Sequence, residues 1–164
     1  MYKCNFLNRT AWFYNLIILS GSSLQSLFLL YMRLTWGGQF LITGWGKLHT
    51  IGKVSSYFAT LNIPYPVFNA YLVGTCEMIG GILLFIGLGS RLAAIPLLII
   101  MFTALGTAHA AQIAELRFLL EPSTLVAQTP YPFLITCLLV FIFGPGRVSI
   151  DALIKRYLEK CEVK

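Results

Sequence analysis

Four long apolar stretches, separated by short polar connections, dominate the hydrophobic pattern of this chain. A helix needs about 20 mostly apolar residues to cross the hydrocarbon core of a membrane. The pattern predicts spans at residues 24–45, 67–88, 92–108 and 132–144, the last being the shortest and extendable back to residue 129. We therefore expect an all-α integral membrane protein, an antiparallel four-helix transmembrane bundle whose membrane domain covers residues 24–146.

The composition supports a membrane protein and excludes other classes. Of the 164 residues, 57% are hydrophobic and 11% are charged, whereas soluble domains carry roughly 25% charged residues. A soluble enzyme, a coiled coil and a disordered chain are thereby excluded. The formal net charge is +6, but the basic residues lie between apolar stretches, where they orient helices. No basic face with interleaved aromatic residues is present, so nucleic acid is not an expected partner.

Both termini are expected to lie along the membrane surface. The apolar run AWFYNLIIL follows Lys3 and Arg9, and residues 1–23 are interpreted as an uncleaved amphipathic segment that bends into the first span near residues 21–23. A cleaved signal peptide is the alternative. Residues 147–164 predict a second interfacial amphipathic segment, in which Ser149 caps a short helix and Asp151 lies in its first turn.

The distribution of Lys and Arg predicts the orientation. If both termini are cytoplasmic, eight basic residues lie inside and three lie outside. The inner set is Lys3, Arg9, Arg91, Arg147, Lys155, Arg156, Lys160 and Lys164, and the outer set is Lys47, Lys53 and Arg117. We therefore expect both termini in the cytoplasm and the connections 46–66 and 109–131 outside.

Glycines recur at heptad spacing on the first two spans. Gly37 and Gly44 share one helix face, as do Gly74 and Gly81. Small residues allow helix backbones to approach closely in lipid, which predicts close packing of these two spans. Gly44, Gly74 and Gly81 are also expected to leave room for a flat ring beside the backbone; the alternative is that they close the helices tightly and leave no cavity.

Two charged residues fall inside the predicted spans, where charge is costly and usually faces the bundle interior. These residues are Arg33 and Glu77, and we expect them to contact each other; Arg33 reaching back to the cytoplasmic interface is the alternative. A second polar group, Lys47, His49 and His109, is expected at the outer mouth. Because carboxylate or thiolate partners are missing there, we predict no metal site.

Known catalytic signatures are missing from the sequence. There is no nucleophile elbow, phosphate loop or zinc-hydrolase motif. The four cysteines, Cys4, Cys76, Cys137 and Cys161, form no closely spaced pair. We interpret them as structural residues.

Several segments together resemble the DoxX family of small four-helix membrane proteins. They are GGQFLITGWGKL after Arg33, SYFATLNIPYP, EMIGGILLFIGLGSRLAA and the closing FGPGRVSIDALI, and they span residues 28–154. The family residues carried over are Arg33, Gly44, Lys47, Glu77, Gly81, Arg91, His109, Gly146, Arg147 and Asp151. One departure lies after His109, where many relatives have an Asn-Gly-Phe-like segment and this chain continues as AAQIAELRF.

The resemblance implies a bacterial inner-membrane protein. Some relatives are subunits of thiosulfate:quinone oxidoreductase, and others associate with sulfur-transfer or oxidative-stress partners. The leading hypothesis is a quinone-linked oxidoreductase subunit, in which Glu77 exchanges protons and Arg33, Lys47 and His109 bind the quinone. The alternatives are a non-catalytic scaffold that holds a soluble redox or sulfur-transfer protein at the bilayer, and a small transporter. The sequence does not specify an oligomeric state.

Overall fold

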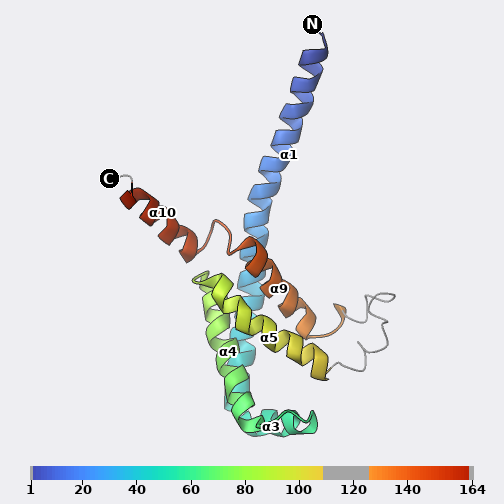
Figure 1. Ribbon diagram of the computed structural model, residues 1–164, viewed down its shortest axis with the longest axis vertical. Coiled ribbons are helices and arrows are strands. Elements are labelled where there is room, and N and C mark those ends of the chain that lie inside the picture. The colour runs from blue at the N-terminus through green and yellow to red at the C-terminus, as the bar shows by residue number, and fades with distance from the viewer. Residues whose placement is uncertain (1, 109–125, 163–164) are drawn as a thin grey trace.

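The computed structural model describes residues 2–108 and 126–162, and this part of the chain is helical and contains no strand (Figure 1). The elements are α1 (Tyr2–Met32), the π-helical turn η1 (Arg33–Gly37), α2 (Gly38–His49), α3 (Ile51–Thr60), α4 (Pro66–Ile86), α5 (Ser90–Ala108), α9 (Pro130–Phe143) and α10 (Ile150–Glu162). Three helical segments are long and apolar enough to cross a membrane, namely Ile17–His49, α4 and α5, while α9 is apolar but shorter. The fold is therefore all-α, with apolar helices compatible with a membrane bundle.

The first helix is continuous where the sequence predicted a bend. α1 runs through residues 21–23 without interruption and continues through η1 into α2 (Figure 1). The Ser22 hydroxyl donates a hydrogen bond to the Leu19 carbonyl, 2.9 Å away, within the helix. The predicted bend is therefore wrong, because the helix continues and the Ser22 hydroxyl is satisfied within it. The irregularity of this long helix lies at η1 instead.

The α2–α4 pair is the tightest contact between helices, and glycines make it possible. A Cβ atom on Gly44 would lie 2.8 Å from the Gly74 carbonyl oxygen, and one on Gly81 would lie 2.8 Å from the Gly37 carbonyl oxygen. The predicted close packing of the first two spans is confirmed. The expected room for a flat ring beside these glycines is wrong, because the neighbouring backbone fills that space.

The second pair, α5 and α9, packs onto this first pair through a buried apolar core. Phe40 of α2 is fully buried, and its ring lies 4.6 Å from that of Phe133 of α9, edge to face. Leu97 and Met101 of α5 join the same cluster. Edge-to-face packing of this kind stabilises a core beyond the area that it buries, so Phe40 and Phe133 connect the two helix pairs.

Helix α3 lies across the ends of α2 and α4, in a stretch that the sequence left as a connection (Figure 1). After α3 the chain reverses through Asn62 and Tyr65, both with positive φ, and Pro66 begins α4. Proline is favoured in the first turn of a helix because its missing N–H has no partner there in any case. The chain thus re-enters the bundle directly beside α2.

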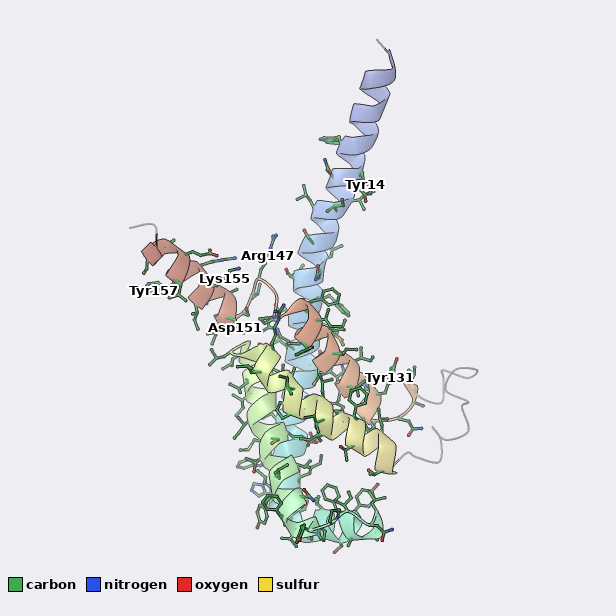
Figure 2. The ribbon with its side chains drawn as sticks, in the orientation of Figure 1. Tyr14, Tyr131, Arg147, Asp151, Lys155 and Tyr157 are labelled. Carbon is green, nitrogen blue, oxygen red and sulfur yellow. The ribbon has the colours of Figure 1, made fainter. Side chains whose placement is uncertain are left out.

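The start of α10 is fixed to the opposite end of the bundle. The Asp151 carboxylate accepts hydrogen bonds from the backbone N–H groups of Gly89, 2.8 Å away, and of Ser90, 3.2 Å away, where α5 begins. Ser149 accepts from the Ala152 N–H at 3.1 Å, so the predicted Ser149 cap is confirmed. Figure 2 shows Asp151 at the α4–α5 turn, whereas Tyr157 lies farther out along α10.

Candidate functional site

Two buried charges occupy different places in the bundle. Arg33 and Glu77 are each 1% exposed. One guanidinium nitrogen of Arg33 donates to the Val148 carbonyl, and the side chain packs against Gly87, whose φ is +75°. Glu77 precedes Gly87 by ten residues, which is about 15 Å along a helix. The predicted Arg33–Glu77 contact is therefore wrong, because the chain after α9 returns to supply the partner of Arg33.

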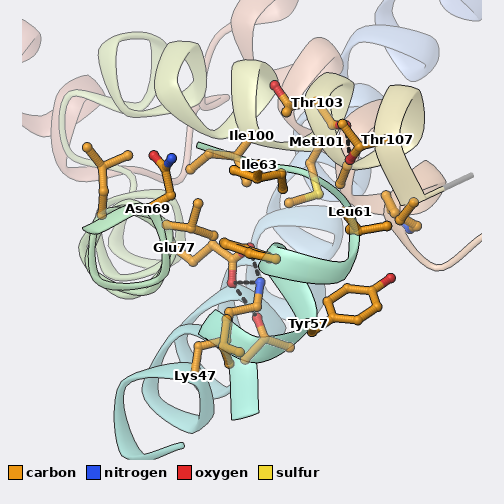
Figure 3. Close-up of a pocket in the computed structure, with 18 of the residues that line it drawn as sticks. Lys47, Tyr57, Leu61, Ile63, Asn69, Glu77, Ile100, Met101, Thr103 and Thr107 are labelled. Carbon is orange, nitrogen blue, oxygen red and sulfur yellow. Dashed lines mark hydrogen bonds and ion pairs between the residues drawn. The ribbon is translucent and has the colours of Figure 1, made fainter. Parts of the chain in front are cut away.

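Glu77 instead pairs with Lys47, which lies near the end of α2 (Figure 3). The Lys47 ammonium donates to both carboxylate oxygens, at 2.5 Å to Oε1 and 2.6 Å to Oε2. The Thr43 hydroxyl lies 3.4 Å from Oε2, within hydrogen-bonding distance. The Lys47 side chain is 32% exposed, so the ammonium is the accessible member of the pair. The carboxylate holds it in place from the buried side.

The helix contact explains why these two groups meet. Lys47 follows Gly44 by three residues in α2, and Glu77 follows Gly74 by three in α4. A Cβ atom on Gly44 would lie 2.8 Å from the Gly74 oxygen and 3.0 Å from the Glu77 carbonyl carbon. Because the two helix backbones are this close, the Lys47 side chain on α2 reaches the Glu77 carboxylate on α4 directly. The glycines therefore position the ion pair rather than create a cavity.

A cavity of about 700 Å³ opens beside the ion pair, bounded by residues of α2, α3, α4, α5 and α9 (Figure 3). Its walls are mostly aliphatic and aromatic, with a few hydroxyl, amide and charged groups. The residues that matter below are Phe40, Thr43, Lys47, Lys53, Val54, Tyr57, Phe58, Leu61, Glu77, Met101, Thr103 and Phe133. Small-molecule sites commonly combine such an apolar lining with a few placed polar groups.

The predicted site residues are only partly brought together. Lys47 and Glu77 share the cavity, as expected, whereas Arg33 does not line it. His49 is exposed and lies beside Trp45, outside the lining. His109 lies outside the described residues, although α5 brings its neighbour Ala108 to the cavity wall.

Sequence reasoning missed the contribution of α3. Lys53, Val54, Tyr57 and Phe58 line the cavity from this helix, and Leu61 lines it directly after the helix ends. Their spacing of i, i+1, i+4, i+5 and i+8 is that of one helical face. That periodicity was the signal that would have found the wall, but the segment is only ten residues long, too short to stand out beside the spans.

Residues 28–110 match the sequence profile of the DoxX family. The chain belongs to the DoxX family. The matched region contains Lys47, Glu77 and the whole of α2, α3, α4 and α5. The closing segment FGPGRVSIDALI, which also contributed to the resemblance, lies beyond it. No curated protein and no solved structure matches this DoxX-family chain.

Proposed function

We propose that this DoxX-family protein is the quinone-binding membrane subunit of an oxidoreductase. The observation that carries the proposal is the Lys47–Glu77 pair, a buried carboxylate fixing a partly exposed ammonium at the wall of an apolar cavity of about 700 Å³. Ionisable groups retained among apolar helices usually mark a functional site. The cavity lies among helices that are themselves compatible with a membrane, so a lipid-soluble ligand could enter it from the bilayer.

The lining fits a quinone in shape and in polarity. A quinone is a flat apolar ring with two carbonyl acceptors, and when bound it supplies a two-electron, two-proton acceptor. Phe58 and Leu61, which are half-buried, offer apolar surface for the ring. A lysine ammonium has three N–H donors, and Glu77 receives two hydrogen bonds from Lys47, which leaves one donor for a ligand oxygen.

The roles of the two residues follow from this geometry. Lys47 Nζ holds a proton at the cavity wall and binds a ligand oxygen through its remaining N–H. The Glu77 carboxylate orients the Lys47 ammonium, because a charge-assisted hydrogen bond fixes both distance and direction. Glu77 is then the group that positions Lys47, rather than one that meets the ligand directly. His109 stays a proposed second ligand of the quinone.

The electron donor is proposed to act through a partner. The family resemblance implies a soluble redox or sulfur-transfer protein that oxidises a reduced sulfur compound, such as thiosulfate, and passes the electrons to the quinone. We also propose that the protein lies in a bacterial inner membrane, with four crossing helices and both termini cytoplasmic. In support, α10 and the α4–α5 turn lie at the end of the bundle opposite α3 (Figure 1).

Quinone binding by the purified protein tests the proposal. We expect a short-chain ubiquinone or menaquinone analogue to bind with micromolar affinity in detergent, measured by calorimetry. Lys47→Gln should weaken binding about tenfold, the scale of one hydrogen bond to a charged group. Lys160→Gln, which removes an exposed positive charge on α10, is the matched control. Absence of quinone binding by the wild-type protein would contradict the proposal and favour the scaffold alternative.

A further inference from the structure

The cavity carries a charge that the ion pair does not balance. Among the described residues, the charged ones that line it are Lys47, Lys53 and Glu77. Lys47 and Glu77 neutralise each other. Lys53 is exposed, and within the described residues its side chain has no hydrogen bond or ion pair. The part of the lining that the structure describes therefore holds one excess positive charge.

This second cation lies on a different wall from the first. Lys53 and Tyr57 are four residues apart on α3, so they share a face of that helix, and both line the cavity. Val54 and Phe58, the next residues, line it as well. The cavity thus has one polar wall formed by Lys47 and Glu77, a second formed by Lys53 and Tyr57, and apolar surface from Phe58.

We propose that the cavity selects a ring ligand that carries one negative charge, an ionised ring-hydroxylated quinone. This inference rests on the proposed function and names the ligand class for the same cavity. Lys53 and the Tyr57 hydroxyl bind the anionic oxygen, and Lys47 donates to a carbonyl oxygen of the same ring. A neutral quinone leaves the Lys53 ammonium beside apolar surface without a counter-charge, whereas an anionic ring supplies one.

Two compounds of similar size separate charge from shape. The first is 2-hydroxy-1,4-naphthoquinone, which is an anion at neutral pH, and the second is 2-methyl-1,4-naphthoquinone, which is neutral. Their affinities are measured by calorimetry on the full-length protein in detergent, at low and at high salt. We expect the anion to bind about tenfold more tightly at low salt, as one charge-assisted hydrogen bond provides. The preference should shrink at high salt because the mouth of the cavity is screened.

Variants of α3 residues test whether Lys53 and Tyr57 cause the preference for the anion. Lys53→Gln should bring the two affinities to within about twofold by weakening the anion alone, and Tyr57→Phe should reduce the preference in part. Lys160→Gln removes the same charge from α10 and should keep the full preference. Thermal unfolding of Lys53→Gln should match that of the wild type, because the side chain is exposed.

The outcomes separate this inference from the proposed function. If both compounds bind the wild type equally, or if Lys53→Gln keeps the preference for the anion, the charge selection is wrong while quinone binding stands. If neither compound binds, the proposed function fails and the selection fails with it. Weakening of the anion by Lys160→Gln to the same degree as by Lys53→Gln would also overturn the inference, because the effect would then be one of net charge.

Discussion

The buried ion pair is the residue-scale feature on which the chemistry depends, and its stability can be separated from its function. Lys47→Met leaves the Glu77 carboxylate buried without its partner, and we expect a loss of about 3 kcal/mol in the free energy of unfolding. The double variant Lys47→Met with Glu77→Leu replaces both charges by apolar groups and should recover most of that loss. Thermal unfolding in detergent measures both effects.

The same double variant also tests whether the pair serves more than the fold. We expect it to be folded yet unable to bind quinone, while Lys160→Met, exposed on α10, changes neither property. A double variant as unstable as Lys47→Met would show that the site cannot accept apolar side chains. A folded double variant with wild-type quinone affinity would remove the ion pair from the binding site.

At this scale the sequence indicated which charged residues are buried better than it indicated their contacts. Glu77 stood out as an acid inside a span, and Lys47 was expected near it. The partner of Arg33 was missed because that contact joins residues 115 positions apart, through the chain that returns after α9. Depth along a helix limits which residues can meet, but it does not reveal a backbone carbonyl supplied by a distant turn.

At the scale of elements, the α2–α4 contact can be tested with two glycine variants of the same helix, one at the contact and one away from it. Gly44→Ala should destabilise the protein by about 1–3 kcal/mol, because its Cβ would meet backbone atoms of α4 that cannot move aside. Gly46→Ala, two residues later in the same helix, has open space around its Cβ and should be neutral or slightly stabilising. Unfolding curves of the two variants measure this difference. Equal free energies of unfolding for Gly44→Ala and Gly46→Ala would contradict the close α2–α4 contact.

The elements that the sequence predicted are those with a strong pattern. Residues 67–88 and 92–108 correspond closely to α4 and α5, because their apolar runs are long. α3 was missed because ten residues with a few polar side chains are typical of a connection. The bend expected at residues 21–23 is wrong because Gly and Ser were given too much weight as helix breakers. The residues on both sides of them are helical, and the helix continues through this stretch. The orientation of residues 1–23 relative to a membrane stays a prediction.

For the whole molecule, composition and periodicity were enough to predict an all-α membrane protein, and the family followed from short motifs in a fixed order. A cavity near Glu77 was expected, but its walls could not be predicted, because they come from five helices whose relative positions depend on tertiary packing. The glycines were correctly expected to bring two spans together, but the space beside Glu77 arises where α3 crosses and α5 diverges. The shape of a ligand site thus depends on the assembled bundle, whereas its charged residues can be recognised individually in the sequence.

The arrangement of the bundle and the distribution of charge together predict the orientation in the membrane. The α3 end carries Lys47 and Lys53, whereas the opposite end carries Arg91, Arg147 and the basic residues of α10. Positive residues are retained on the cytoplasmic side, so the cavity should open toward the outer leaflet. Alkaline phosphatase inserted after Asn62, in the exposed α3–α4 turn, should be active, and the same enzyme fused after Lys164 should be inactive. Green fluorescent protein at the two positions should give the reverse pattern. Phosphatase activity after Lys164 would contradict this orientation and would place the cavity on the cytoplasmic side.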